Sequence, residues 1–480
     1  MAKDGFDLVI GLGVSGRSVI RYLTDQGMPV RALDTRAEPA GLEALRAEFP
    51  NVKIHTGGFK AGWMNNARRL IVSPGVAVAT PAIAEQVVAG KEVIGDVELF
   101  ARAASEPLVA ITGSNAKSTV TTLLGQVADA CGMNPGIGGN LGVPALELLD
   151  DKARLYVLEL SSFQLETTYS LSAEVATILN VSQDHLDRYA SFADYVAAKQ
   201  RIYDGCQVAV WNRDDLATRP PAGVPRQISF GAHPEADYRL DTENGRLLCR
   251  GEQLLALSEL ALTGHHNAMN ILSVLAISDA LSLNRDKALA TVKAFTGLPH
   301  RCQQVAEAGG GRWFNDSKAT NVGATLAALT GIGESIEGKV ILVAGGLGKG
   351  QDFSPLAEPA RQYLRAALLM GEDRTTVAQG MSAAPCELVA DMAVAVRRAH
   401  ALAQPGDAVL LSPACASFDQ YSGFAARGDD YTTRAQELCH DRAHDPESRP
   451  YGDRQTAVVD GYFVGSGRAS DGVIRQFADC

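Results

Sequence analysis

The sequence lacks the features that mark several large classes of protein. Its eight cysteines are scattered and form no C-x-x-C pair, a pattern that predicts neither a zinc site nor a disulfide framework. No stretch approaches the roughly 18 uncharged apolar residues that a membrane span requires. The opening stretch, MAKDGFDLVIGLG, contains no basic segment followed by a long apolar run, so no secretory signal is predicted. We therefore expect a cytoplasmic protein without a membrane span.

A surplus of positive charge is absent as well. The chain has 44 Lys and Arg residues against 55 Asp and Glu residues, a formal net charge of -11 at pH 7. Because a polyanion is bound mainly through lysine and arginine, this balance disfavours a nucleic-acid partner. It leaves room for a local basic site that takes one small anionic ligand.

The sequence does contain a regular alternation of element types. Short apolar runs rich in Val, Ile and Leu alternate with amphipathic stretches of helix length, which predicts an α/β fold with mainly parallel sheets. A chain of 480 residues is too long for one core and suggests about three domains. Turns rich in glycine or hydroxyl residues interrupt strand-like runs at 6–16, 107–119 and 339–350.

These turns divide the chain into three expected domains and a tail. The expected domains are residues 1–96, 97–299 and 300–440, followed by residues 441–480. The tail is polar and has little periodicity, so we expect it to be largely disordered, with at most a short strand in AVVDGYFVG.

The first turn, GLGVSG, has the glycine spacing of a nucleotide-binding loop. Gly11, Gly13 and Gly16 let the backbone turn tightly and approach a diphosphate at the start of a helix. Asp34 follows the next apolar run, where a carboxylate can accept a hydrogen bond from a ribose hydroxyl. The pattern predicts a bound nucleotide without saying which one, and a tight turn with nothing bound is the alternative.

The second turn, GSNAKST, has the composition of a phosphate loop with unusual spacing. The common loop, G-x-x-x-x-G-K-S/T, would have glycine where this chain has Ile111 and Ala116. Lys117 would contact the β- and γ-phosphates, and Ser118 or Thr119 would offer an oxygen to Mg²⁺. Because alanine disfavours positive φ, we predict that Ala116 has a negative φ and a methyl group that points away from the phosphates. A capped helix start is the alternative.

Polar side chains gather at two further predicted strand ends. Glu159 ends the apolar run in RLYVLELSSFQLE. Asp184, His185 and Asp187 follow the run in TILNVSQDHLDRY, and Lys199 lies in the helix beyond. Each taken alone is more simply a surface acid or a core histidine. Because ligands bind at the carboxyl ends of parallel strands, these residues together with the phosphate loop predict a Mg²⁺–ATP site with oxygen-rich ligands.

Longer motifs then occur in a fixed order along the chain. They are GSNAKST, GGN, ELSSFQLE, NVSQDHLDRY, GHHNAMN, LPHR, NDSKATN and SPACASFDQ. From about residue 5 to residue 438 this series resembles the Mur ligase family, and SSFQLE and NDSKATN resemble its D-glutamate-adding members. The family's phosphate loop has only two residues between its glycines, which accounts for the short spacing here, while Ala116 stays a departure.

The resemblance implies a fold and a reaction. A Rossmann-like N-terminal domain would bind the UDP of a sugar nucleotide, a P-loop-type central domain with a mainly parallel sheet would bind ATP, and a Rossmann-like C-terminal domain would bring the amino acid. The implied enzyme is a monomer that adds D-glutamate to UDP-N-acetylmuramoyl-L-alanine through an acyl phosphate in peptidoglycan precursor synthesis. It would use ATP and two Mg²⁺ ions, with Lys199 carbamylated by CO₂.

The resemblance also implies roles for individual residues. The implied catalytic residues are Lys117, Glu159, His185 and Lys199. The implied metal ligands are Ser118, Thr119, Glu159, His185 and, when carbamylated, Lys199. The implied ATP-binding residues are Gly113, Ser114, Asn115, Ala116, Lys117, Ser118, Thr119, Asn267, Asn270, Arg301 and Asp316. The residues implied for the UDP-linked substrate are Val14, Ser15, Asp34, Thr35, Arg36, Ser73, Gly75 and Asn140, and those implied for D-glutamate are Lys318, Thr320, Lys349, Ser417 and Phe424.

The chain departs from the family pattern in two further places. Leu347 stands in GGLGKG where the family more often has GGDGK, which puts the hydrogen bonding of that loop in question although Lys349 is kept. The tail has no counterpart in the resemblance. Three alternatives stay open. They are a Mur-type or folylpolyglutamate synthase-like ligase for another amino acid, a nicotinamide dehydrogenase based on GLGVSG, and a non-catalytic nucleotide-binding protein.

Overall fold

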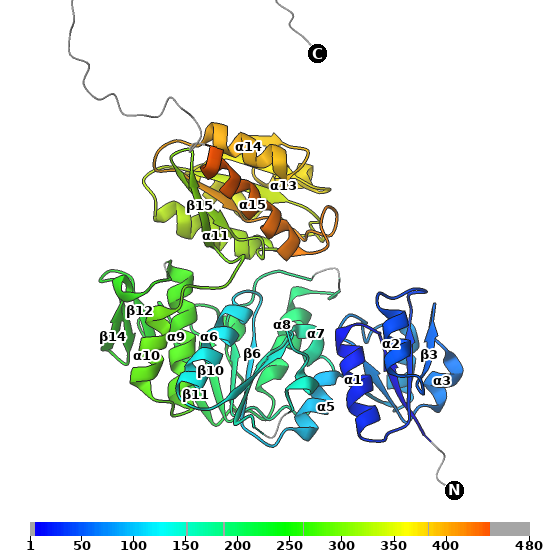
Figure 1. Cartoon of the computed structure of the whole chain (residues 1–480). Coiled ribbons are helices and arrows are strands. Elements are labelled where there is room, and N and C mark those ends of the chain that lie inside the picture. Colours follow the sequence, from blue (N-terminus) through cyan, green and yellow to red (C-terminus); the bar gives the residue numbers. More distant parts are fainter. Residues whose placement is uncertain (1–4, 150–151, 186–187, 263, 383, 442–480) are drawn as a thin grey trace, which may run out of the picture. The chain divides into compact units, whose positions relative to one another are not determined.

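The computed structural model describes residues 5–149, 152–185, 188–262, 264–382 and 384–441 (Figure 1). As far as Cys439 the chain forms one compact unit, which contains three separate sheets. Apart from Asp441, the tail predicted at 441–480 lies outside the described residues, so its disorder and its short strand stay predictions. In the part of the chain that is described, no helix is both long and apolar enough to cross a membrane.

The first sheet has five parallel strands in the order β3-β2-β1-β4-β5. Its strands are β1 (Asp7–Ile10), β2 (Val30–Asp34), β3 (Lys53–Thr56), β4 (Arg69–Val72) and β5 (Glu92–Ile94). Its helices are α1 (Val14–Asp25), α2 (Leu42–Glu48), α3 (Ala61–Asn66) and α4 (Pro81–Val88). The strand order reverses between β1 and β4, and ligands bind outside the carboxyl ends of strands at such a point.

The second sheet has nine strands in the order β14-β13-β12-β11-β10-β9-β6-β8-β7. Its strands are β6 (Leu108–Thr112), β7 (Pro135–Gly139), β8 (Leu155–Glu159), β9 (Val175–Ile178), β10 (Val208–Asn212), β11 (Arg226–Gly231), β12 (Tyr238–Asp241), β13 (Arg246–Cys249) and β14 (Glu252–Ala256). Its helices are α5 (Asp96–Ala103), α6 (Lys117–Ala130), α7 (Ser162–Leu165), α8 (Phe192–Gln200), α9 (His265–Ala280) and α10 (Arg285–Ala294). The sheet is parallel from β7 to β12 and ends in an antiparallel edge at β13 and β14, which the sequence alternation did not indicate.

The third sheet has six strands in the order β15-β16-β20-β17-β18-β19, parallel except for β15. Its strands are β15 (Gln303–Ala308), β16 (Gly311–Asn315), β17 (Val340–Gly345), β18 (Leu364–Met370), β19 (Cys386–Leu388) and β20 (Ala408–Leu411). Its helices are α11 (Val322–Glu334), α12 (Ala357–Tyr363), α13 (Arg374–Gly380), α14 (Met392–Leu402) and α15 (Phe424–Asp441). The predicted α/β class with three mainly parallel sheets is confirmed, while the residue boundaries of the domains stay predictions.

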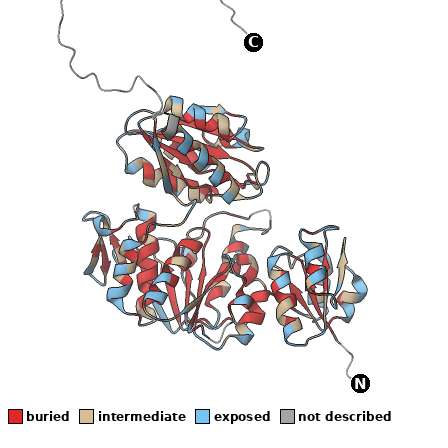
Figure 2. Cartoon of the chain, in the orientation of Figure 1, coloured by how far each residue is buried: buried red, intermediate tan, exposed pale blue. Residues whose placement is uncertain are grey.

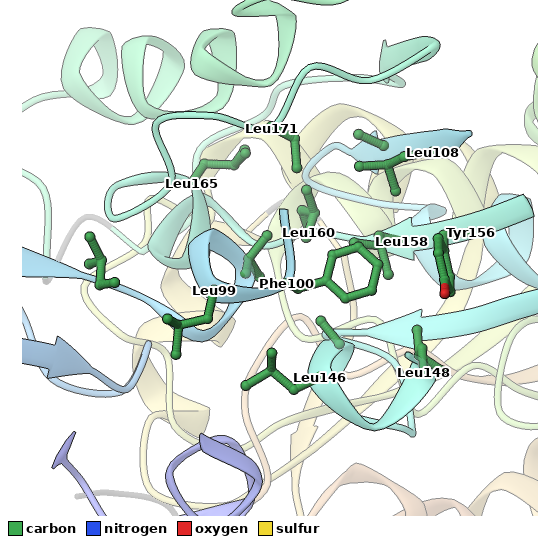
Figure 3. Packing of buried hydrophobic residues seen from close by; sticks show 14 of the residues in the cluster. Leu99, Phe100, Leu108, Leu146, Leu148, Tyr156, Leu158, Leu160, Leu165 and Leu171 are labelled. Carbon is green, nitrogen blue, oxygen red and sulfur yellow. The ribbon is translucent and has the colours of Figure 1, made fainter. Parts of the chain in front are cut away.

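The middle strands of each sheet are buried, and helices cover them (Figure 2). Helix α5 shows how this is achieved, because its Phe100 lies beside Leu158 of β8 (Figure 3), and Leu99 and Tyr156 belong to the same buried cluster. The rings of Phe100 and Tyr156 meet edge to face with centroids 5.0 Å apart. Burying a side chain of this size contributes roughly 1.5–3 kcal/mol. This packing fixes α5, the first helix after β5, against the central sheet.

Candidate active site

The phosphate loop connects the buried strand β6 to helix α6. Helix α6 begins at Lys117, and Ala116 precedes it in the left-handed conformation, with φ of 65°. The predicted negative φ is therefore wrong. Alanine pays roughly 1–2 kcal/mol for this conformation, and the penalty is offset because Ser114 and Asn115 are hydrogen-bonded to Asn180. Ala116 packs against the apolar cluster of the central sheet.

Two lysines converge on one backbone oxygen of this loop. The Lys117 ammonium donates to the carbonyl oxygen of Gly113 at 2.8 Å, and the amino group of Lys199 lies 2.9 Å from the same oxygen. Burial lowers the pKa of both amines, and Lys117 lowers the pKa of Lys199 further, against the opposing effect of Glu159. The charged forms of both amines are therefore disfavoured here, and a nearby anionic group would favour them again.

Glu159 ends β8 with its side chain buried. The side-chain amide of Asn140 donates to Glu159 Oε1 at 2.7 Å, whereas Glu159 Oε2 has no hydrogen-bond partner among the residues that the structure describes. A buried carboxylate oxygen without a partner is costly unless a cation or donor satisfies it. Hard oxygen ligands are what Mg²⁺ prefers, so this atom fits the predicted metal site. Among the described residues, no group of three or more His, Cys, Asp and Glu side chains is placed to hold a metal ion.

His185 lies beside Asp184 in the loop that follows β9. Its backbone N–H donates to Asp184 Oδ1 at 2.9 Å, and its ring packs edge-on against Phe163 at 4.8 Å. Burial lowers the pKa of His185, although Asp184 opposes the shift. The imidazole is therefore neutral at pH 7, the state in which it can bind a cation. Asp187, which the sequence grouped with these two residues, lies outside the described residues.

The structure brings most of the predicted catalytic and ATP-binding residues into one cavity of about 280 Å³, which we call the phosphate cavity. The predicted residues that line it are Ser114, Asn115, Ala116, Lys117, Ser118, Asn140, Glu159, His185, Lys199, Arg301, Lys318 and Thr320. Ser118 therefore shares a cavity with Glu159, whereas Thr119 does not. Gly113 takes part through its carbonyl oxygen, which accepts from both lysines.

A neighbouring cavity of about 460 Å³, which we call the α9 cavity, contains the remaining predicted ATP residues. These are Thr119, Asn267, Asn270 and Asp316. Asp316 is buried and accepts hydrogen bonds from the Ser412 hydroxyl at 2.8 Å and from the Cys302 N–H at 3.2 Å. Burial raises the pKa of Asp316 to about 7, although both hydrogen bonds oppose the shift.

A third cavity, of about 640 Å³, lies at the turn after β1, and we call it the N-terminal cavity. It contains every residue predicted for the UDP-linked substrate, namely Val14, Ser15, Asp34, Thr35, Arg36, Ser73, Gly75 and Asn140. Burial alone would raise the pKa of Asp34, but hydrogen bonds from Arg36 and from the Leu12 N–H lower it to about 2. Asn140 lines this cavity and the phosphate cavity.

Of the residues predicted for D-glutamate, Lys318, Thr320, Lys349 and Ser417 lie in loops of the C-terminal sheet, and Phe424 begins α15. Lys318 Nζ lies 3.8 Å from the centroid of the Phe424 ring, and burial lowers the pKa of Lys318 to about 8. Lys349 Nζ lies 3.7 Å from Asp184 Oδ1, beside the phosphate cavity. Ser417 is buried, and neither it nor Phe424 lines any of the three cavities.

Two asparagines belong to the site although the sequence did not single them out. Asn321 donates through its side-chain amide to Asn115 Oδ1 and to Asp184 Oδ2, both at 3.1 Å. Asn180 contacts Asn115 from the opposite side, and its side chain lines the α9 cavity. Both stand inside quoted motifs, NDSKATN and NVSQDHLDRY, but only their contacts distinguish them from their neighbours.

The loop that contains Leu347 makes its hydrogen bonds without the missing carboxylate. The backbone groups of Leu347 and Ala416 pair in both directions at 2.9 Å, and the Gly348 N–H donates to Asp373 at 2.7 Å. The loop therefore keeps its hydrogen bonds with Leu347 in place of the aspartate.

Comparisons with known proteins agree with this geometry. Three family models match the chain: Mur ligase MurD-like N-terminal domain over residues 6–95, Mur ligase middle domain over 111–278, and Mur ligase glutamate ligase domain over 300–415. Among solved structures, MurF ligase from Thermotoga maritima in complex with ADP is 17% identical, with a TM-score of 0.58 over 86% of this chain and 95% of its own. A pseudomurein peptide ligase type C from Methanothermus fervidus is equally similar, covering 91% of this chain and 100% of its own. These likenesses show the fold.

Curated relatives are much closer in sequence. The UDP-N-acetylmuramoylalanine–D-glutamate ligase of Alcanivorax borkumensis is 93% identical over 441 residues, which are 92% of this chain and 100% of the relative. The enzyme of the same name from Pseudomonas aeruginosa is 49% identical over 91% of this chain and 99% of its own length. This chain therefore belongs to the Mur ligase family, within its branch of UDP-N-acetylmuramoylalanine–D-glutamate ligases.

Proposed function

We propose that this chain forms the amide bond between UDP-N-acetylmuramoyl-L-alanine and D-glutamate, with hydrolysis of ATP to ADP and phosphate, in peptidoglycan precursor synthesis. The observation that carries the proposal is the convergence of Lys117, Lys199 and Glu159 on one cavity at the phosphate loop. The 93% identity to a relative of that name supports the same reaction. ATP and sugar nucleotides are metabolites of the cytoplasm, and we therefore propose that the enzyme acts there. We also propose that it is a monomer.

The residue types suit the chemistry of amide formation. A carboxylate is a poor electrophile, so its oxygen first attacks the γ-phosphorus of ATP and ADP leaves. The neutral amine of D-glutamate then attacks the acyl carbon, and phosphate leaves from the tetrahedral intermediate as the amine loses its proton. Phosphoryl transfer is mainly positioning and charge neutralisation. Lys117, held beside the loop by the Gly113 and Ser114 carbonyls, supplies positive charge for the γ-phosphate.

The residues around Glu159 fit the predicted magnesium ions. Glu159 Oε2, the neutral imidazole of His185 and the hydroxyl of Ser118 would hold them from the phosphate cavity. Thr119, also predicted as a ligand, would have to reach them from the side of the α9 cavity. When bound, Mg²⁺ would neutralise charge on the phosphate oxygens. Because this set contains one carboxylate, a second ion needs another anionic ligand nearby.

Lys199 is the residue that we propose to supply this ligand. Burial, and after it the neighbouring Lys117, lower the pKa of Lys199 well below its ordinary value, which favours the nucleophilic neutral amine. Addition of that nitrogen to the carbon of CO₂, with loss of a proton, converts the side chain into a carbamate anion. The carbamate would lie beside Lys117 and turn a repulsion between two amines into an attraction.

The other two substrates are assigned by the remaining residues. We propose that the N-terminal cavity takes the UDP group, with the exposed guanidinium of Arg36 closing over the uracil. Asn267, Asn270, Arg301 and Asp316 would bind the nucleoside of ATP, with Asp316 at the ribose. Lys318, Thr320, Lys349, Ser417 and Phe424 would bind D-glutamate, whose two carboxylates match the two lysines.

Release of ADP tests the whole assignment. We expect ADP to appear only when UDP-N-acetylmuramoyl-L-alanine and D-glutamate are both present, and not with L-glutamate, L-lysine or meso-diaminopimelate. Absence of release with the full set would refute the ligase. If the absorbance of a nicotinamide cofactor at 340 nm changed when a substrate was added, a dehydrogenase would be favoured instead.

Replacement of Lys199 tests the carbamate. Lys199→Ala should lose most of its activity, and a small carboxylate added to the assay should restore part of it by presenting an anion in the vacated space. The matched control is Lys117→Ala, which the same carboxylate should not restore because it lacks a cation. Equal behaviour of the two variants would contradict different roles for the two lysines.

A further inference from the structure

One residue from the neighbouring strand end makes several hydrogen bonds to the backbone of the phosphate loop. Asn180 lies just beyond β9 and is separated from Asn115 by 65 positions in the sequence. Its side-chain Oδ1 accepts from the Asn115 N–H at 2.8 Å, and its Nδ2 donates to the Asn115 carbonyl at 3.3 Å. Its own backbone carbonyl accepts from the Ser114 N–H at 2.9 Å. One asparagine thus makes three hydrogen bonds to two consecutive loop residues.

These hydrogen bonds stop immediately before Ala116, the residue in the left-handed conformation. Alanine adopts this conformation less readily than glycine, because its Cβ approaches the following carbonyl oxygen. Such strain persists only when surrounding contacts fix the backbone on either side. On the far side, the Ala116 carbonyl accepts the first hydrogen bond of α6, from the Val120 N–H. Ala116 is therefore held between the Asn180 contacts and the helix.

We propose that Asn180 is a positioning residue for the reaction: its side-chain amide holds the Asn115 peptide, and so keeps Ala116 left-handed and the first N–H groups of α6 directed at the phosphates of ATP. The inference rests on the proposed function, because it assumes that ATP binds at this loop. It goes beyond the site residues that the resemblance implied, which include Asn115 and Ala116 but not Asn180.

Asparagine suits this task better than its close relatives. Its donor and acceptor lie on one edge of a planar group and match the N–H and C=O of a single residue. Aspartate has the same shape but no donor, so one of its oxygens would face the Asn115 carbonyl. Its charge would also add repulsion toward phosphate. Serine is too short to make both contacts at once.

The test is a cycle of Asn180→Ala and Ala116→Gly, measured as kcat and KM for ATP. Loss of two hydrogen bonds that orient the loop should lower kcat/KM about 30-fold in Asn180→Ala. Ala116→Gly, which changes a residue of the loop itself, is measured alone to complete the cycle. In the double variant the loss caused by Asn180→Ala should shrink to about fivefold, since glycine adopts positive φ without help. The same loss in both backgrounds would overturn the link to Ala116.

Asn284→Ala provides a matched control for general destabilisation. Asn284 caps α10 by accepting from the Lys287 N–H at 3.0 Å, and it lines none of the three cavities. Loss of such a cap destabilises a helix, but kcat/KM for ATP should stay within about twofold of the original. A comparable loss of kcat/KM in Asn284→Ala and Asn180→Ala would assign Asn180 a merely structural role and overturn the proposal.

Calorimetric titration with ADP and Mg²⁺, without the other substrates, separates this inference from the proposed function. If the original protein binds ADP but forms no amide, only the proposed function fails. Asn180→Ala should bind ADP at least about tenfold more weakly, and Asn180→Asp at least as poorly. Unchanged ADP affinity in Asn180→Ala would refute the inference even if ligation is observed.

Discussion

The turn after β1 and the turn after β6 both lead from a buried strand into a helix beside a cavity, yet they are built differently. The first relies on missing side chains, because a Cβ on Gly16 would lie 1.9 Å from the Gly11 carbonyl oxygen. The second keeps a side chain on its left-handed residue, Ala116, and holds the backbone with Asn180. A turn that needs close approach requires glycine, whereas a turn that needs only an unusual φ can be fixed by distant hydrogen bonds.

The buried acids of the N-terminal cavity and the α9 cavity also differ, because their pKa values shift in opposite directions. Asp34 in the N-terminal cavity is buried but paired with Arg36, and its pKa falls to about 2. Asp316 in the α9 cavity accepts hydrogen bonds from Ser412 and Cys302, and burial raises its pKa to about 7. One acid is therefore a fixed anion that organises its turn. The other changes its charge near neutral pH, in the cavity that we assign to ATP.

The largest expected effect comes from removing the charge that only the second turn carries. Lys117→Ala should lower kcat at least about 100-fold, because it removes a contact to the charge that develops in the transition state. Single-turnover ADP release would measure this. Ser15→Ala in the first turn is the matched change and should mainly raise KM for the sugar nucleotide. A normal kcat in Lys117→Ala would show that the second turn is remote from the chemistry.

Next in size is the effect of adding a Cβ to the first turn. Gly16→Ala forces the Cβ against the Gly11 carbonyl, and overpacking of this kind costs roughly 1–3 kcal/mol, or about 5- to 150-fold in KM for the sugar nucleotide. Gly13→Ala is the control for stability, because no described residue beyond its chain neighbours has an atom within 4 Å of the added Cβ. Thermal unfolding should be followed for both variants. Equal tolerance of the two substitutions would remove the contrast between the turns.

The smallest effect concerns stability against pH. From about pH 4 to pH 7 the folded protein keeps a proton on Asp316 that the unfolded chain has released, so this acid makes stability fall as pH rises. Asp316→Asn should therefore gain in melting temperature relative to the original protein between pH 5 and pH 8. The lowered pKa of Asp34 works in the opposite sense, and its stabilisation is lost only below about pH 4. Asp34→Asn should then show a constant deficit from pH 5 to pH 8.

The sequence was a good guide to the fold and to the groups around each cavity. Alternating apolar runs predicted parallel sheets, and strand ends identified Glu159 and His185, because the carboxyl ends of parallel strands lie along one edge of the sheet. The antiparallel strands β13 and β14 were not indicated, since sheet pairing depends on partners that periodicity does not reveal.

The φ of Ala116 was predicted with the wrong sign for a similar reason. Local propensity gave the penalty for alanine correctly, but it could not include Asn180, 65 positions from Asn115. Asn321 was missed because its contacts to Asn115 and Asp184 join different parts of the chain. The identity of a residue at a strand end predicts the chemistry it can perform. Only the folded structure shows which neutral side chains hold the loop in position.

Asn140 lines both the N-terminal cavity and the phosphate cavity. The substrate has uridine diphosphate at one end and a carboxylate at the other. Because Asn140 joins the two cavities, their spacing would select the length of the substrate. A sugar nucleotide without the alanyl arm would fill the first cavity and end short of the second. The enzyme would then select the length of the sugar nucleotide before the amide bond forms. A shortened sugar nucleotide would act as a competitive inhibitor of the full substrate.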